Sequence, residues 1–249
     1  MTLSGIVQSV VTALGLVSSV WLANYVVLAL LAYFRKTRWP RSVEVKDWPP
    51  LSIHVPIYNE RYVVRRLLEA VLNLDYPSHR LQVVIVDDST DDTSAIIEEF
   101  LRSNSHRGIE VIHLRRRSRE GFKAGALQEA LRVTRGEFVA VFDADFVPPK
   151  DFLKRVLPYL LADERTGAVQ VRWDHLNGGN SSLTRGQALN LDMHFEVEQR
   201  ARSSAGLFLN FNGTAGVWRG RCIEDSGGWR PFLAEDLELS VRAYLKGWR

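Results

Sequence analysis

Residues 137–146 read EFVAVFDADF, and this stretch decides the fold class. Its apolar run, which contains β-branched residues, is typical of a buried β-strand. Two carboxylates, Asp143 and Asp145, stand where the run ends. Residues i and i+2 of an extended segment point to the same side, so these two side chains can converge. The stretch therefore predicts a buried strand with an acidic pair at its carboxyl end.

Further strand-like runs alternate with helical patterns on both sides of this stretch. Strands are predicted at 51–57, 81–87, 109–114, 137–143 and 167–173. The spacing of apolar residues predicts helices at 61–72, 92–101 and 122–133. This order is typical of βαβ units, and it predicts an α/β fold with a mostly parallel sheet and helices on both faces. Ligands of such sheets bind at the carboxyl ends of the strands, where the acidic pair stands.

The N-terminal segment differs in kind from the rest of the chain. Residues 6–34 contain no charged side chain, and about 20 apolar residues in a helix suffice to cross a bilayer core. We therefore expect one N-terminal transmembrane helix, with a cleaved signal peptide as the alternative. Basic residues that flank a span favour the cytoplasmic side, and four follow this one: Arg35, Lys36, Arg38 and Arg41. The expected location is the inner or plasma membrane, with the catalytic domain in the cytoplasm.

The composition indicates an ordinary globular protein beyond this helix. The chain has 249 residues, of which 46% are hydrophobic and 24% charged, and such values argue against disorder. The net charge of +3 comes without a basic block, so no nucleic-acid partner is expected. Cys222 is the only cysteine, which rules out an intrachain disulfide. We predict a membrane helix with its flank at 1–36, a proline-containing linker at 37–50 and a folded domain at 51–249.

The acidic pair after the predicted strand at 137–143 needs a compensating positive charge if the two carboxylates converge. Like charges that lie close repel strongly unless a cation or protons intervene. Mg²⁺ or Mn²⁺ suits carboxylate oxygens and keeps coordination positions open for phosphate oxygens. The alternative is a solvated turn in which Asp143 and Asp145 are both exposed.

Two other predicted strands end in polar residues at the same edge of the sheet. Asp87 and Asp88 follow the strand at 81–87, although one of them can instead cap the next helix. Tyr58 and Glu60 follow the strand at 51–57. A planar ring can rest on Tyr58 while a carboxylate accepts hydrogen bonds from its N–H groups, which describes a nucleobase site.

A third acidic feature opens the amphipathic pattern near the C-terminus. Glu235 and Asp236 precede the inward-facing leucines of EDLELSVRAYLKGW. Acids in a first helical turn interact favourably with the helix dipole and need no catalytic role. The position of these two residues is therefore compatible with a helix start and with an active site.

Seven segments together resemble a family 2 glycosyltransferase of the GT-A fold. They occur in order between residues 50 and 249: VPIYNE, VIVDDSTDD, GFKAGAL, VFDADF, FNGTAGVWR, GGW and EDLELSVRAYLKGW. Residues 189–219 are similar to the cellulose-synthase-like branch, which includes plant β-mannan synthases and xyloglucan glucan synthases.

The resemblance implies a donor site for a nucleotide sugar. Asp88, Tyr58 and Glu60 would hold the base, Lys123 would meet the phosphates, and Asp143 with Asp145 would bind Mg²⁺ or Mn²⁺. The full set implied for donor binding is Pro56, Tyr58, Glu60, Asp87, Asp88, Lys123 and Asp143. Without the resemblance, Lys123 reads as a solvated lysine at a helix start. The arginines at 115, 116, 117 and 119 either attract anionic phosphates or form a solvated loop.

The resemblance also implies an acceptor site and a general base. Asp236, next to Glu235, would accept the proton of the acceptor hydroxyl. Phe211, Asn212 and Gly213 would line the acceptor end. Trp229 would offer a stacking surface to a sugar ring, with a core position as the alternative.

The implied reaction is inverting, metal-dependent transfer of a hexose from GDP-mannose or UDP-glucose to a growing β-linked polysaccharide. The alternatives are transfer of one sugar to a lipid phosphate or other acceptor, a glycoside hydrolase, and an inactive membrane-anchored sugar-binding subunit. Chain-extending relatives carry Q-x-x-R-W and further membrane helices downstream, which this sequence lacks. QVRW at 170–173 is one residue too short to match. We therefore expect a domain that is incomplete at its C-terminus.

Overall fold

A computed structural model describes residues 2–35, 42–104, 106 and 108–249. The chain divides into two units. One combines Pro40–Arg172 with Asn210–Arg249, and the other combines Met1–Trp39 with Trp173–Leu209. The basic residues at 36, 38 and 41, on which the predicted orientation depends, lie outside the described residues, as does the start of the predicted linker.

The first unit is built around a six-stranded sheet with the order β3-β2-β1-β4-β6-β5. The strands are β1 (Leu51–Ile57), β2 (Leu81–Asp87), β3 (Glu110–Arg115), β4 (Phe138–Val141), β5 (Ala168–Gln170) and β6 (Gly216–Arg219). β1 pairs in parallel with β2 and β4, and β2 pairs in parallel with β3. β6 lies antiparallel to both β4 and β5. The predicted α/β fold with a mostly parallel sheet is thus confirmed.

The predicted strands agree with the structure best where the strand is buried on both faces. β1 and β2 begin and end at the predicted residues. β4 is shorter than the predicted run and ends at Val141. β6 was not predicted, because its four residues, which begin with a glycine, are too few to show an alternating pattern. At Gly216 an added Cβ would lie 2.5 Å from the Phe211 ring, so a glycine is required for this strand to pack.

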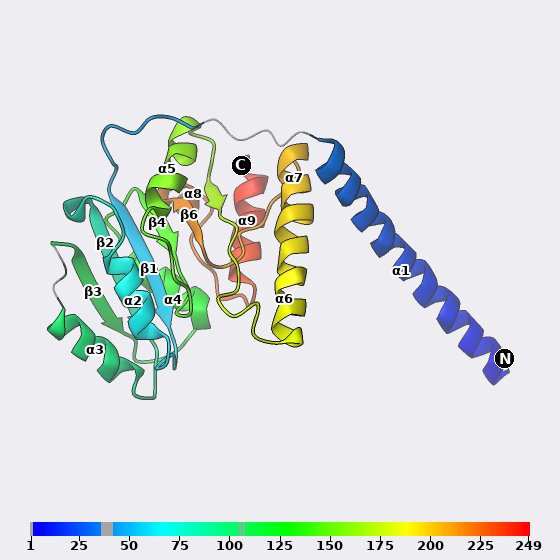
Figure 1. Ribbon diagram of the computed structural model, residues 1–249, viewed down its shortest axis with the longest axis horizontal. Coiled ribbons are helices and arrows are strands. Elements are labelled where there is room, and N and C mark those ends of the chain that lie inside the picture. Colours follow the sequence, from blue (N-terminus) through cyan, green and yellow to red (C-terminus); the bar gives the residue numbers. More distant parts are fainter. Residues whose placement is uncertain (1, 36–41, 105, 107) are drawn as a thin grey trace. The chain divides into compact units, whose positions relative to one another are not determined.

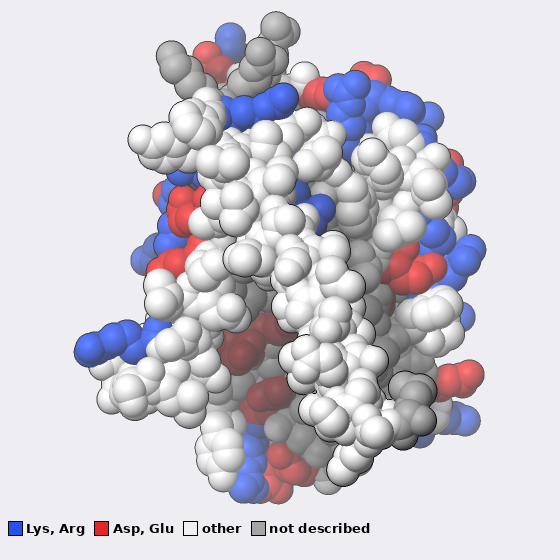
Figure 2. Space-filling model, turned by 90° about the vertical axis from the view of Figure 1, so that its right-hand side faces the viewer, with Lys and Arg blue, Asp and Glu red and all other residues white. Residues whose placement is uncertain are grey.

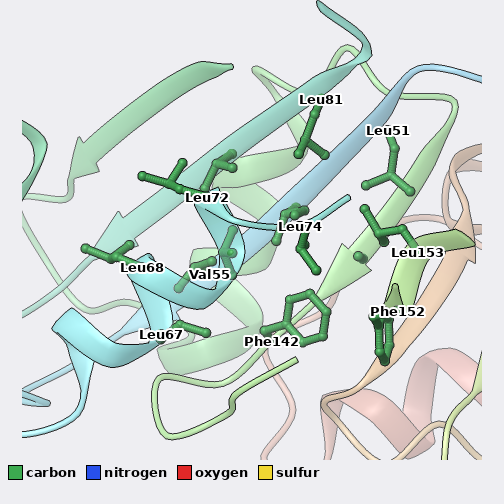
Figure 3. Packing of buried hydrophobic residues seen from close by; sticks show 14 of the residues in the cluster. Leu51, Val55, Leu67, Leu68, Leu72, Leu74, Leu81, Phe142, Phe152 and Leu153 are labelled. Carbon is green, nitrogen blue, oxygen red and sulfur yellow. The ribbon is translucent and has the colours of Figure 1, made fainter. Parts of the chain in front are cut away.

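Helices cover both faces of the sheet (Figure 1). One layer consists of α2 (Val64–Leu72), α3 (Thr93–Ser103) and α5 (Phe152–Ala162), whose apolar residues form one cluster with alternate residues of β1 and β2. Figure 3 shows this cluster, in which Leu67 and Leu68 of α2 lie against Val55. The opposite layer consists of α4 (Phe122–Leu131), α8 (Gly220–Asp225) and α9 (Glu235–Leu245).

The strand order determines where on the sheet a ligand is expected. The chain runs outward from β1 to β2 and β3, and then returns to place β4 against the other edge of β1. Ligands of open α/β sheets bind at the carboxyl ends of the strands where the order reverses in this way. Tyr58 follows β1, and Asp143 and Asp145 follow β4, at this reversal.

The second unit contains helix α1 (Leu3–Phe34), together with α6 (Ser182–Asp192), a π-helix η2 (Met193–Gln199) and α7 (Arg200–Ala205). Arg35 Nη1, just after α1, donates to the Ser204 carbonyl at 3.3 Å. Helix α1 carries no Lys, Arg, Asp or Glu and is white in Figure 2. It is long and apolar enough to cross a membrane.

Candidate active site

Lys123 joins three segments that lie far apart in the sequence. Its Nζ atom lies 2.5 Å from Asp143 Oδ1, just after β4. The same atom donates to the Gly213 carbonyl at 3.0 Å and lies 3.7 Å from Glu235 Oε1 at the start of α9. A lysine in the first turn of α4 therefore holds the end of β4, the loop before β6 and the beginning of α9 around one point.

Gly213 brings Asp236 to the same point. Its φ angle is +79°, a conformation that favours glycine. A Cβ added at this position would lie 3.2 Å from Asp236 Oδ2 and 3.2 Å from Lys123 Nζ, so the absence of a side chain allows both groups to approach. Asp236 is anchored in α9, where Ser240 Oγ donates to its carbonyl at 2.6 Å.

The carboxylates of this site interact electrostatically. Burial raises the pKa of Asp143; Lys123 opposes this shift, whereas Asp145 and Asp236 add to it. Burial also raises the pKa of Glu235, again opposed by Lys123 and reinforced by Asp236 and Asp143.

Glu60 belongs to the same electrostatic group. Burial, followed by the charges of Asp145 and Asp143, raises the pKa of Glu60. Each of these three effects disfavours the charged form of the carboxyl group. The carboxylates at the ends of β1 and β4 therefore lie close enough to disfavour one another's charged form.

The pair Asp143 and Asp145 fits a hard divalent cation that a diphosphate helps to hold. Asp145 is exposed in the loop after β4, and its carbonyl accepts a hydrogen bond from Arg66 Nη2 at 3.2 Å. In the described part of the chain, no group of three or more His, Cys, Asp or Glu side chains is arranged to hold a metal. Mg²⁺ is usually bound through one or two carboxylates, with phosphate and water oxygens completing its coordination. A carboxylate pair matches that donor set.

Asp88 lies at the carboxyl end of β2 and is paired with Arg116. Arg116 Nε donates to Asp88 Oδ1 at 2.7 Å, and the other guanidinium nitrogen contacts Oδ2. The Asp88 backbone N–H donates to the Ile57 carbonyl at 2.9 Å, which fixes the end of β2 beside the end of β1.

Asp87 is fully buried and shapes the loop that follows β2. It accepts hydrogen bonds from the Ser89 N–H at 2.9 Å and from His113 Nε2 at 3.1 Å. Burial alone would raise the pKa of Asp87, but the hydrogen bonds from His113 and Ser89 outweigh it and hold the pKa well below its usual range. Its side chain therefore supports the loop from within, whereas the Asp88 side chain is free of that network.

Tyr58 is exposed after β1, and an arginine covers its ring. The Arg119 guanidinium carbon lies 3.4 Å from the Tyr58 ring centroid. Pro56, also predicted for the donor site, is half-buried within β1 and pairs with Val86. Arg116 and Arg119 belong to the run of arginines for which attraction of phosphates or a solvated loop was predicted; their contacts with Asp88 and Tyr58 were not predicted.

Of the four residues predicted for the acceptor, two are buried in the core and two, Asn212 and Gly213, lie in the loop before β6. Phe211 and Trp229 are buried in the cluster between the sheet and α9, and Trp229 packs on Trp218 with ring centroids 6.1 Å apart. This is the core position that the sequence left open for Trp229. The Asn212 N–H donates to Gln170 Oε1 at 2.8 Å. Gln170 lies in the predicted strand at 167–173, but a strand pattern does not report which loop its side chain contacts.

A family model described as glycosyl transferase family 2 matches residues 52–220. The chain belongs to this family. It is 42% identical over 210 residues to glucomannan 4-beta-mannosyltransferase 1 of Oryza sativa subsp. japonica, covering 81% of this chain and 40% of that protein. It is 44% identical over 208 residues to glucomannan 4-beta-mannosyltransferase 1 of Cyamopsis tetragonoloba, covering 82% of this chain and 40% of that protein. The chain thus spans about 40% of the length of these curated relatives.

Two solved structures share the fold. A mannosyltransferase, PcManGT of Pyrobaculum calidifontis in complex with GDP-Man and Mn²⁺, matches with a TM-score of 0.69 and 25% identity, covering 92% of this chain and 60% of that chain. TarS 1-349 of S. aureus in complex with UDP-GlcNAc matches with a TM-score of 0.57 and 21% identity, covering 78% of this chain and 53% of that chain. The predicted family and its GT-A type of fold are confirmed.

Proposed function

We propose that this chain transfers a hexose from a nucleotide sugar to a β-linked polysaccharide, with inversion at the anomeric carbon. The observation that carries the proposal is the convergence on Lys123: Asp143 lies 2.5 Å and Glu235 3.7 Å from its Nζ, and Gly213 brings Asp236 alongside. In this arrangement groups suited to a diphosphate, a metal ion and an acceptor hydroxyl share one crevice.

In the proposed donor complex the base lies at the ends of β1 and β2. Tyr58 offers its ring, and Asp88 and Glu60 accept hydrogen bonds from the base, with Pro56 and Asp87 shaping the two strand ends. Lys123 contacts the phosphates. The glucomannan mannosyltransferase relatives and the GDP-Man complex of PcManGT support GDP-mannose over UDP-glucose.

In the proposed metal site Asp143 and Asp145 hold Mg²⁺ or Mn²⁺ with the donor diphosphate. When bound, the cation stabilises the negative charge that develops on the leaving diphosphate. The Mn²⁺ in the PcManGT complex supports a divalent ion of this kind.

In the proposed chemical step Asp236 acts as the general base. The acceptor hydroxyl loses its proton to the carboxylate as its oxygen attacks the anomeric carbon. Attack from the face opposite the diphosphate gives a β-linked product from an α-linked donor, and no covalent enzyme intermediate is needed. Glu235 is buried beside Lys123 and holds that ammonium in place.

On the acceptor side we propose that Asn212 and Gly213 line the entry, with Phe211 and Trp229 supporting it from the core. Residues 1–36 would anchor the chain in the inner or plasma membrane. Residues 37–50 would link this anchor to the cytoplasmic catalytic domain, which residues 51–249 would form. The acceptor is then a polysaccharide or lipid-linked sugar at the membrane surface.

The test is a donor screen on the membrane-bound chain. GDP-mannose and UDP-glucose are supplied in turn with Mn²⁺ or Mg²⁺, and released nucleoside diphosphate and product length are measured. We expect GDP release from GDP-mannose that requires the divalent ion and disappears in Asp236→Asn, while GDP still binds to that variant. Turnover of neither donor, or full activity of Asp236→Asn, contradicts the proposal.

A further inference from the structure

The segment between β3 and α4 is folded back over the donor side of the site and held there by Arg116. Besides contacting Asp88, Arg116 donates to the Glu120 carbonyl at 2.8 Å and to the Phe122 carbonyl at 2.9 Å. Gly125 makes this possible, because a Cβ there would lie 2.0 Å from the Glu120 carbonyl oxygen and 2.6 Å from Arg116 Nη1.

Phe122 is strained within this segment. Its φ angle is +49°, in the left-handed region that a phenylalanine rarely adopts. Its N–H donates to the Arg119 carbonyl at 3.0 Å, which closes a turn. Strained backbone of this kind persists where surrounding contacts enforce it, and it concentrates at ligand-binding sites. The turn directs Arg119 toward Tyr58.

Arg119 lies between two exposed rings. Its guanidinium carbon is 3.4 Å from the Tyr58 centroid and 5.2 Å from the Phe122 centroid. In the described part of the chain its guanidinium makes no hydrogen bond and no ion pair. A distance of 3.4 Å is the stacking distance of two flat groups in contact, so the guanidinium occupies the face of Tyr58 on which a nucleobase would rest.

We infer that Arg119 is a further donor-binding residue that forms the second wall of the nucleobase slot, opposite Tyr58. The inference rests on the proposed nucleotide-sugar donor and assigns the position of its base. The base inserts between the two side chains: Arg119 rotates outward on its flexible stem, and its guanidinium then stacks on the outer face of the base. Stacking of this kind accepts any nucleobase, because every base has a π-face, and the arginine adds a cation–π contribution.

The test is binding of guanosine, which lacks phosphate, to the full chain by isothermal titration calorimetry. We expect Arg119→Ala to weaken guanosine binding about tenfold, consistent with the loss of one stacking partner. Arg119→Lys keeps the charge but loses the flat group, and it is expected to weaken binding to a similar extent. Arg117→Ala is the matched control, because the described contacts give the Arg117 side chain no hydrogen bond, ion pair or ring contact; its affinity should stay within about twofold of the original.

Unchanged or tighter guanosine binding in Arg119→Ala overturns the inference, because Arg119 would then only cover the Tyr58 ring. If Arg119→Ala binds guanosine normally while GDP binding and Asp236-dependent transfer persist, the role of Arg119 in base binding is ruled out but the proposed function stands. If the original chain binds neither guanosine nor GDP, both fail. Thermal unfolding of each variant establishes that it is folded, and substitution of an exposed arginine is expected to leave the midpoint unchanged.

Discussion

Lys123 is the residue on which the balance of charge in the site depends. Its ammonium group faces Asp143 and Glu235, whose pKa values burial has already raised. Without that positive charge both carboxyl groups are harder to ionise. The ammonium group also holds the Gly213 loop by a hydrogen bond at 3.0 Å.

Replacing Lys123 by Met is therefore expected to weaken binding of GDP about tenfold or more, as befits loss of a charge-assisted hydrogen bond. GDP affinity measured by calorimetry checks this. Lys150→Met is the matched control, since Lys150 is an exposed lysine in the loop between β4 and α5. Equal affinity in Lys123→Met and the original chain would show that the phosphates bind elsewhere.

The raised pKa values of Asp143 and Glu235 also determine a pH dependence. Their folded-state pKa values exceed the unfolded ones, so the folded state binds protons that the unfolded state releases. Stability of the metal-free protein should therefore fall as pH rises from about 4, the ordinary carboxyl value, through the raised values. Asp143→Asn should make this fall shallower in urea unfolding followed by tryptophan fluorescence.

Asp87 provides the opposite sign for the same experiment. Its pKa is lowered, so its stabilising contribution is present above the ordinary value and is lost as pH falls through the folded one. Asp87→Asn should thus lower stability at neutral pH and have little effect in strong acid. For Asp143→Asn, a steeper fall of stability with rising pH than in the original chain would contradict the raised pKa of Asp143.

At the scale of one element, the first turn of α4 is set by a glycine. Gly125 leaves room for the Glu120 carbonyl and for Arg116, which together position the turn containing Phe122. Side chains of Lys123 and Arg116 reach the site only if this turn keeps its place. The helix start thus links local backbone packing to donor binding.

Gly125→Ala is expected to displace this turn, because its Cβ would meet backbone 2.0 Å away, and to reduce GDP affinity by at least tenfold. Gly186→Ala is the matched control: it lies in α6, its Cβ meets nothing within 4 Å, and alanine is the better helix former. Circular dichroism and calorimetry compare the two. Normal GDP affinity in Gly125→Ala would separate the α4 turn from the donor site.

At the scale of the whole molecule, a membrane-spanning α1 would hold the whole chain at a membrane. Its 32 residues contain no charged side chain. A charged residue at the centre of such a span costs about 2.5–3.5 kcal/mol on insertion scales. We expect the chain to stay with membranes after alkaline carbonate extraction, and Leu16→Arg to shift much of it into the supernatant, whereas Leu16→Ile should not. Complete extraction of the original chain would contradict the anchor.

The sequence by itself determined the elements whose signals are local. β1 and β2 were predicted within their bounds because buried parallel strands are continuous apolar runs. Asp143 and Asp145 were placed at a strand end because the run stops there, and α1 followed from length and the absence of charge. The family followed from ordered motifs and was confirmed by the match over 52–220.

Only the tertiary structure decided which of these signals meet. Lys123 and the Gly213 carbonyl are 90 positions apart, and their contact depends on β6 entering the sheet beside β4. The burial of Trp229, the support of the Asp87 loop by His113 and the stacking of Arg119 on Tyr58 likewise arise from neighbours distant in sequence. Hydrophobic periodicity reports on what one segment buries, whereas electrostatic and stacking partners are fixed by strand order and loop packing.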